Sequence, residues 1–177
     1  MSPTAKLRTT TMLAIAGLAS LQLVALTAAK GNPPGQPVRA CQRSGLAGSF
    51  KLIPNSGALG SVEYLLKLRN TGSKPCLVSQ LPALSLLGKT GNALPTHVLG
   101  AGKASKNSII GPGRTVSSPV RLSPDIPSGT EPMTGACEPT SYKLQLTPSR
   151  GATPLKIAIH PPTPVCEHGE LALRNAL

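Results

Sequence analysis

The sequence is constrained most by short runs in which apolar and polar residues alternate. The run from Ser61 to Arg69 reads SVEYLLKLR and would place four apolar side chains on one face, namely Val62, Tyr64, Leu66 and Leu68. Because side chains along a β-strand alternate between two faces, this pattern predicts a strand with one buried and one solvated face. No segment keeps a 3.6-residue period long enough to indicate a helix. The chain is therefore expected to be all-β.

Seven or eight such strands are expected, separated by clusters of Gly, Pro, Asn and Ser. They fall at residues 50–52, 61–69, 84–86, 116–122, 142–146, 155–160 and 171–173, with another beginning at Cys76. Short strands at such spacings are typical of a β-sandwich or barrel. Pro119 is expected to place its strand at a sheet edge or beside a bulge, because proline cannot donate to the ladder. The core is predicted to be aliphatic, since Phe50, Tyr64 and Tyr142 are the only aromatic residues.

The N-terminal residues have the pattern of a secretory signal peptide. Lys6 and Arg8 precede an uncharged apolar run over residues 12–26, and Thr27, Ala28 and Ala29 follow it. A membrane-spanning helix takes about 20 residues, so the run is too short to cross a bilayer comfortably. Small residues after such a run suit signal peptidase. Residues 1–29 are therefore predicted to be cleaved on export.

The rest of the chain is predicted to be a linker followed by one domain. Residues 30–40 read KGNPPGQPVRA, which is too rich in Pro, Gly and polar residues to bury an apolar face. Residues 41–177 are expected to form the β-domain. They contain no second long apolar run, so no transmembrane span is expected in the mature chain. The predicted location is secreted, periplasmic or at the cell envelope.

Four cysteines, Cys41, Cys76, Cys137 and Cys166, agree with export. An even number of cysteines in an oxidising compartment indicates a disulfide framework, although four cysteines allow three pairings. We favour Cys41 with Cys76 and Cys137 with Cys166. Each of these pairs would close a loop of about 30 to 35 residues, worth about 3 to 4 kcal/mol in the chain-entropy model.

The chain is strongly basic. Loss of residues 1–29 would remove Lys6 and Arg8 and lower the formal net charge from +12 to +10. Such an excess of positive charge favours anionic partners. For an exported protein these are phosphorylated envelope polymers, anionic lipid headgroups or acidic proteins. The bases are dispersed without a run, so plain solvation of strand faces is the alternative explanation. Nucleic acid is not expected as a partner, because the few aromatic residues cannot build a stacking platform.

Several of these residues together resemble a known family. The segment Leu68, Arg69, Asn70, Thr71, Gly72 is followed by Pro75, Cys76 and Leu77, then by Leu81 and Pro82, with Cys41 upstream. This order, the hairpin at residues 86–94, the turn at residues 111–113 and the late pair Cys137 and Cys166 resemble the secreted bacterial family called domain of unknown function DUF4232. The likeness runs from Cys41 to about Leu173. It implies a single exported, immunoglobulin-like β-sandwich with two disulfides, and it implies no activity.

One segment matches a known motif in form but is expected to fold as a hairpin. Residues 83–90 read ALSLLGKT and match a permissive form of the phosphate-binding loop. That loop needs a glycine-rich cradle followed by a helix. Here the intervening residues read as a strand, and Gly91 and Asn92 continue a turn.

The chain has few residues of the types that usually carry catalysis. The chain has one aspartate, Asp125, and three histidines, His97, His160 and His168, and it lacks the G-x-S-x-G elbow that presents a nucleophilic serine. His160, Cys166 and His168 are close in sequence and have the chemistry of soft-metal ligands. A disulfide would remove Cys166 from that set, so no metal or other cofactor is predicted.

We therefore expect a non-catalytic binding or structural module that contacts an anionic envelope component or an acidic protein. Lys51, Lys67 and Arg69 are the candidate binding residues, on the assumption that the strands near Phe50 and Tyr64 are neighbours in one sheet. The alternative hypothesis is a secreted hydrolase or metal-handling protein that uses His160 and His168.

Overall fold

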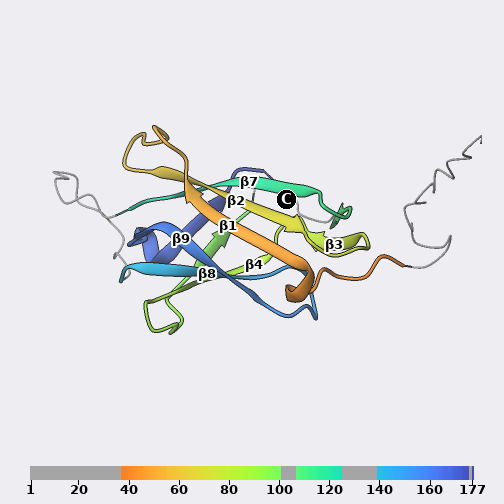
Figure 1. Ribbon diagram of the computed structural model, residues 1–177. Helices are drawn as coiled ribbons and strands as arrows, with labels where there is room; N and C mark the ends of the chain where they lie inside the picture. The colour runs from red at the N-terminus through yellow and green to blue at the C-terminus, as the bar shows by residue number, and fades with distance from the viewer. Residues whose placement is uncertain (1–36, 101–106, 125–138, 176) are drawn as a thin grey trace, which may run out of the picture.

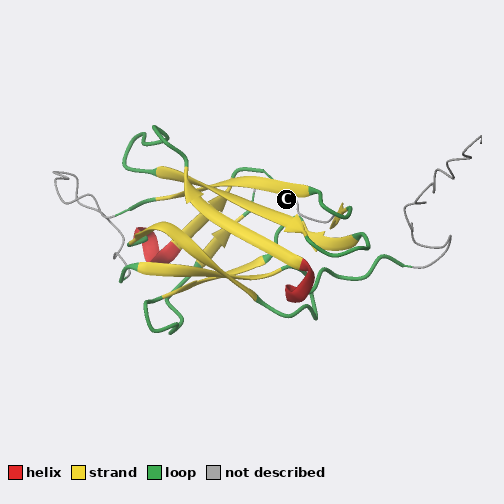
Figure 2. Ribbon diagram, in the orientation of Figure 1, coloured by secondary structure: helices red, strands yellow, loops and turns green. Residues whose placement is uncertain are grey.

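The computed structural model describes residues 37–100, 107–124, 139–175 and 177 (Figure 1). In chain order the elements are η1 (Arg43–Gly45), β1 (Leu46–Leu52), β2 (Val62–Asn70), β3 (Cys76–Ser79), β4 (Ala83–Leu87), β5 (His97–Leu99), β6 (Asn107–Ile110), β7 (Thr115–Leu122), β8 (Ser141–Thr147), β9 (Leu155–Thr163), α1 (Cys166–Gly169) and β10 (Glu170–Leu173). Strands dominate these residues, which confirms the all-β prediction (Figure 2). None of the helices found in them is long and apolar enough to cross a membrane. The predicted signal peptide lies outside the described residues.

Eight strands form one continuous sheet in the order β4-β8-β9-β1-β2-β7-β10-β5, and β3 and β6 form a separate pair. Most neighbours are antiparallel, while β1 with β9 and β5 with β10 are parallel. The contact between β1 and β9 joins only Phe50 to Ile159 and Lys51 to His160. This short ladder connects a half made of β4, β8 and β9 to a half made of β1, β2, β7, β10 and β5.

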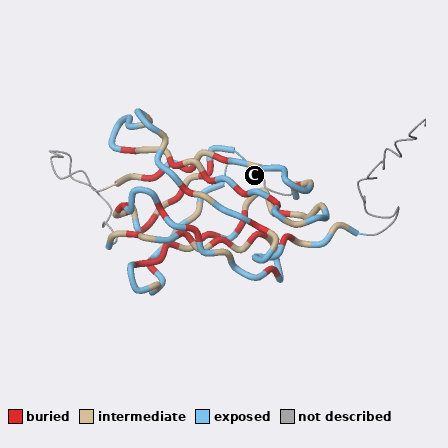
Figure 3. Tube along the Cα trace, viewed as in Figure 1, coloured by how far each residue is buried: buried red, intermediate tan, exposed pale blue. Residues whose placement is uncertain are grey.

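The two halves share one hydrophobic core. In Figure 1, β1, β2 and β7 lie on the upper side of the molecule and β4 and β8 on the lower side. Buried leucines from both halves belong to the same cluster, among them Leu66 and Leu68 from β2 and Leu144 and Leu146 from β8. The buried positions run along the interior of the trace in Figure 3. The sheet therefore curls so that residues of its two halves pack in one core.

The core is aliphatic except for one aromatic pair. Phe50 and Tyr64 are buried and stack with their ring centroids 5.0 Å apart. Tyr142 is only partly buried. The prediction of an aliphatic core is confirmed, because leucine, isoleucine and valine provide most of the fully buried side chains.

Strand β2 has the two faces that its alternation predicts. Tyr64, Leu66 and Leu68 are buried, whereas Lys67 and Arg69 are exposed. Hydrophobic burial holds the first set in the core, since each fully buried leucine contributes about 1.5 to 3 kcal/mol relative to an exposed one.

The expected number of seven or eight strands was too low, because the described residues contain ten. The two strands that sequence reasoning missed are β5, which has three residues, and β6, which has four. Runs this short do not complete enough alternations to be recognised. Their pairing with β10 and with β3 makes them strands.

The expectation that Pro119 marks an edge or bulged strand was wrong. Strand β7 is interior, with β2 on one side and β10 on the other. The carbonyl oxygen of Pro119 accepts a hydrogen bond of 2.9 Å from the N–H of Arg174. In a strand the N–H and C=O of one residue point to the same side, so the missing N–H of Pro119 faces β10. The last registered pair of the β7–β10 ladder is Val120 with Leu173, next to Pro119, so the proline removes only the one bond that its own N–H would have donated.

Candidate binding surface

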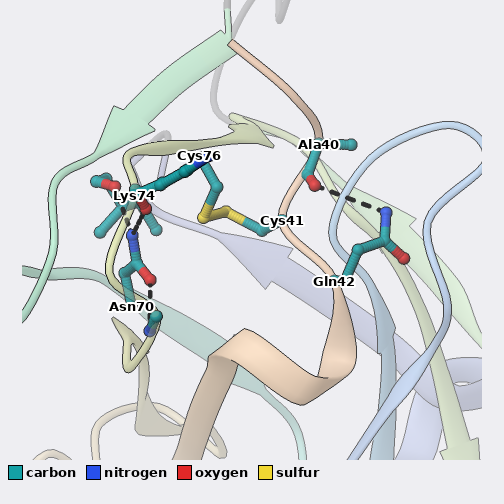
Figure 4. Close-up of a disulfide and its surroundings, with 8 residues drawn as sticks. Ala40, Cys41, Gln42, Asn70, Lys74 and Cys76 are labelled. Carbon is teal, nitrogen blue, oxygen red and sulfur yellow. Dashed lines mark hydrogen bonds between the residues drawn. A yellow bond between two sulfur atoms is a disulfide. The ribbon is translucent and has the colours of Figure 1, made fainter. Parts of the chain in front are cut away.

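The first predicted disulfide is present. Cys41 and Cys76 are bonded with their Cα atoms 4.8 Å apart, and they close a separation of 35 residues (Figure 4). A crosslink over a loop of this length stabilises the fold by about 3 to 4 kcal/mol in the chain-entropy model. Ala40 and Cys41 also pair with Leu77 of β3 through the backbone, so the end of the predicted linker is held against the sheet.

The second predicted disulfide is only half within the described residues. Cys166 is buried and disulfide-bonded. Its predicted partner Cys137 lies outside the described residues, and this pairing stays a prediction. Asp125 also lies outside them.

The turn before Cys76 is organised by Asn70, which is buried. Its side-chain nitrogen donates to the carbonyl oxygens of Lys74 and Ile110, each at 2.8 Å, and its side-chain oxygen accepts from the N–H of Gly72 at 2.9 Å (Figure 4). Its amide satisfies polar groups that burial removes from water.

The three candidate binding residues lie together on one face. β1 and β2 are antiparallel neighbours, which confirms the assumption behind the predicted patch. Lys51 lies opposite Leu65, so Lys67 is its diagonal neighbour, about 7 to 8 Å away between Cα atoms. Arg69 follows Lys67 two residues along the same strand, and all three side chains are exposed.

His160 joins this group, which we call the basic patch and define as Lys51, Lys67, Arg69 and His160. Its position on β9 is directly beside Lys51 in the parallel ladder, and it is exposed. Sequence alternation alone could show that His160 faces outward. It could not show which strand lies beside β9, because a parallel neighbour leaves no local signal.

Two shallow hollows lie along the basic patch. One of about 270 Å³ is lined by Ser49, Lys51, Leu52, Ile53, Pro54, Leu65 and Lys67. The other, of about 220 Å³, is lined by Ala47, Gly48, Ser49, Lys67, Arg69 and Thr115. The residues opposite Lys67 and Arg69 on β1 are Ser49 and Ala47, whose short side chains leave this space open.

The one acidic residue on the outward face of β2 is already paired. Glu63 lies toward the far end of the strand and forms an ion pair with Arg174, with 3.4 Å between Oε1 and Nε. Among the described positions of β1 and β2, no carboxylate therefore stands between the bases of the patch. An anion that approached Lys51, Lys67 and Arg69 would meet no fixed negative charge there.

The histidines do not assemble a metal centre in the part of the chain that is described. No group of three or more His, Cys, Asp or Glu side chains suited to a metal occurs there. His160 lies on β9 beside Lys51, whose ammonium group opposes a bound cation, and His168 is exposed in α1. Glu167 and His168 have positive φ angles, so α1 is a tight turn rather than a regular helix.

The residues that match the phosphate-loop pattern form a strand and a tight turn, as predicted. β4 is followed at once by a turn in which the N–H of Gly88 donates to the carbonyl oxygen of Asn92, and Leu87 bridges to Ala93. Gly91 has a φ of 89°, as such a turn requires. No helix follows to receive a phosphate group.

Tyr64 is a buried titratable residue of β2, on the opposite face from Lys67 and Arg69. Its hydroxyl donates to the carbonyl oxygen of Pro161 at 2.8 Å. Burial raises the pKa of this hydroxyl above its ordinary value, and a hydrogen bond with the Thr163 side chain opposes that shift. The phenol is therefore neutral over the whole physiological range, and it serves packing rather than proton transfer.

Comparison with known families agrees with this architecture. The family model described as Domain of unknown function (DUF4232) matches residues 41–175, which include both cysteines of the observed disulfide and all strands of the fold. No curated protein and no solved structure matches the chain. The match covers most of the sequence, and the protein therefore belongs to the DUF4232 family.

Proposed function

We propose that this protein is a non-catalytic binding module whose basic patch holds an anionic polymer of the cell envelope. The observation that carries the proposal is the convergence of Lys51, Lys67, Arg69 and His160 from three neighbouring strands onto one exposed face. These bases are dispersed in the sequence. The sheet brings neighbouring bases to spacings of about 5 to 8 Å, which suits repeated charges along a chain better than one isolated anion.

The shape of this face also supports a polymer. The two hollows share Ser49 and Lys67, so they form neighbouring parts of one shallow surface. A shallow surface leaves most of a ligand in water, and its attraction is mainly electrostatic and therefore sensitive to salt. Enclosed sites that bury a small molecule are deeper and mostly apolar.

Export and the two-layer architecture belong to the same proposal. The signal-peptide pattern of residues 1–29 supports export, and so does the Cys41–Cys76 disulfide, because such crosslinks persist in oxidising compartments. We propose that the two halves of the curled sheet are the layers of an immunoglobulin-like sandwich and that Cys137 pairs with Cys166. Protein recovered from the envelope or medium should lack residues 1–29 and react with no thiol reagent.

The binding proposal is tested with polyphosphate as a probe polyanion. The exported protein should bind it, and the affinity should fall as NaCl is raised from about 50 to 200 mM, where the Debye length falls well below the span of the patch. The double variant Lys51→Glu/Lys67→Glu should lose this binding. Envelope extract passed over the immobilised protein should yield a salt-eluted polymer only with the unaltered patch.

A matched control makes the same change in net charge at another place on the surface. Lys89 and Arg150 are exposed at the turns that follow β4 and β8, and neither lines the two hollows of the basic patch. The double variant Lys89→Glu/Arg150→Glu should retain at least half of the affinity. If both double variants lose binding equally, attraction depends only on net charge and the basic patch is not the site.

A further inference from the structure

The loop between β1 and β2 ends in a tight turn with an apolar tip. Ala58 and Ser61 exchange two backbone hydrogen bonds of 2.9 and 3.0 Å, which leaves Leu59 and Gly60 as the central residues. Their φ angles are 47° and 73°. Two central residues with positive φ are the mark of a type I′ hairpin turn, whose first position favours Asn, Asp or Gly.

Leu59 breaks that preference and gains no burial from doing so. Its side chain is 100% exposed. Elsewhere among the described residues, positive φ angles belong to glycines and to Asn55, Glu167 and His168, so Leu59 is the apolar exception. A leucine in this conformation costs free energy, and in the isolated protein no contact offsets that cost.

The turn is held by hydrogen bonds to its own backbone and to β7. The Ser61 hydroxyl donates to the carbonyl oxygen of Ala58 at 2.8 Å and accepts from Nε of Arg121 at 2.8 Å. The N–H of Ile53 donates to the carbonyl oxygen of Glu63 at the base of the loop. Figure 1 shows this loop extending beyond the body of the sheet at the end where β1 stops. Leu59 is thus presented at the tip of a hydrogen-bonded projection.

Basic residues stand on both sides of the loop. On one side, Lys51 and Lys67 line a hollow together with Ile53 and Pro54. On the other side, Leu59 itself lines a hollow with Arg121, Arg174 and Glu63. Glu63 is paired with Arg174, so the surroundings of the loop carry a net positive charge.

We propose that this loop docks the protein onto an anionic lipid surface, with Leu59 inserted among the acyl chains and the flanking bases against the headgroups. This inference rests on the proposed function and names a second anionic structure that Lys51 and Lys67 of the basic patch meet. A water-soluble polymer would leave Leu59 in water, whereas a bilayer offers apolar surface beneath a layer of negative charge. Peripheral proteins commonly combine an apolar insertion with basic residues in this way.

Vesicle flotation tests the proposal. The exported protein should float with vesicles of phosphatidylglycerol and phosphatidylcholine, and it should not float with vesicles of phosphatidylcholine alone. Leu59→Asn should weaken binding to the anionic vesicles by roughly 10- to 100-fold, which is the contribution of one buried leucine side chain. Lys51→Glu/Lys67→Glu should weaken it as well, while Lys89→Glu/Arg150→Glu should bind like the wild type.

Folding does not confound this test. Asparagine is favoured at the first position of a type I′ turn, so Leu59→Asn should unfold at the same temperature as the wild type or higher. Leu59→Gly serves as a second variant with the same expectation.

The outcomes separate this inference from the proposed function. Equal flotation of Leu59→Asn and wild type, or no flotation of the wild type, overturns lipid docking. If polyphosphate binding through Lys51 and Lys67 persists in either case, the proposed function stands. Loss of both activities overturns both.

Discussion

The side-chain nitrogen of Asn70 lies 2.8 Å from the carbonyl oxygen of Ile110, forty residues further along the chain. The hydrogen bond joins the end of β2 in the large sheet to the end of β6 in the small one. The same nitrogen holds the carbonyl oxygen of Lys74, two residues before the disulfide cysteine Cys76. One amide therefore links the turn before Cys76 to the contact between the two sheets.

Replacement of Asn70 by alanine should lower the free energy of unfolding by about 2 to 3 kcal/mol, because buried carbonyl oxygens lose their donor. Asn70→Asp should be at least as harmful, since a carboxylate would face the oxygens of Lys74 and Ile110. Urea unfolding measures both. Asn175→Ala, at an exposed position, should change stability by no more than about 0.5 kcal/mol. An Asn70→Asp variant as stable as the wild type would show that these hydrogen bonds contribute nothing.

Gly169 can be compared with Gly113 to separate steric obstruction from backbone strain. Both have positive φ, 75° and 69°. A Cβ on Gly169 would lie 2.1 Å from the carbonyl oxygen of Pro95, whereas a Cβ on Gly113 would meet nothing within 4 Å. Gly113→Ala should cost about 1 kcal/mol, and Gly169→Ala about 3 to 4 kcal/mol because the backbone at Pro95 must move. Equal thermal shifts for the two variants would contradict the close approach.

Gly48 and Ile157 should be energetically coupled. A Cβ on Gly48 would lie 2.4 Å from Cδ1 of Ile157, closer than real contacts allow. Gly48→Ala should cost about 1 to 3 kcal/mol through overpacking. Adding Ile157→Val removes Cδ1 and should recover about 1 kcal/mol of that loss in a double-mutant cycle. Strictly additive effects would mean that the Ile157 side chain does not pack against Gly48.

Tyr64→Phe should lower stability at neutral pH by about 1 kcal/mol, because the hydrogen bond to Pro161 is lost. The folded-state pKa of Tyr64 is raised above the ordinary value by burial. Its contribution is therefore complete below that ordinary value of about 10 and is lost as the pH rises through the folded pKa. The gap in unfolding free energy between wild type and Tyr64→Phe should shrink above pH 10. If the difference in unfolding free energy stays constant up to pH 12, the Tyr64 hydroxyl is as exposed to water in the folded state as in the unfolded state.

Particular elements show how far sequence reasoning reached. The period-two pattern in β2 predicted which of its side chains are buried, because alternation is a local property of an extended chain. The preferred pairing of Cys41 with Cys76 is present, although the sequence left three pairings open. The three-residue strand β5 escaped prediction because its parallel partner β10 is more than seventy residues away.

The sequence by itself determined an all-β chain with alternating faces, a large positive charge and membership of the DUF4232 family. Tertiary structure alone decided that His160 stands beside Lys51, that Pro119 sits in an interior strand and that Asn70 is buried between two sheets. The physical reason is that alternation depends on neighbouring residues. Strand order depends on which distant segments bury their apolar faces together, and that choice is made only when the whole core forms.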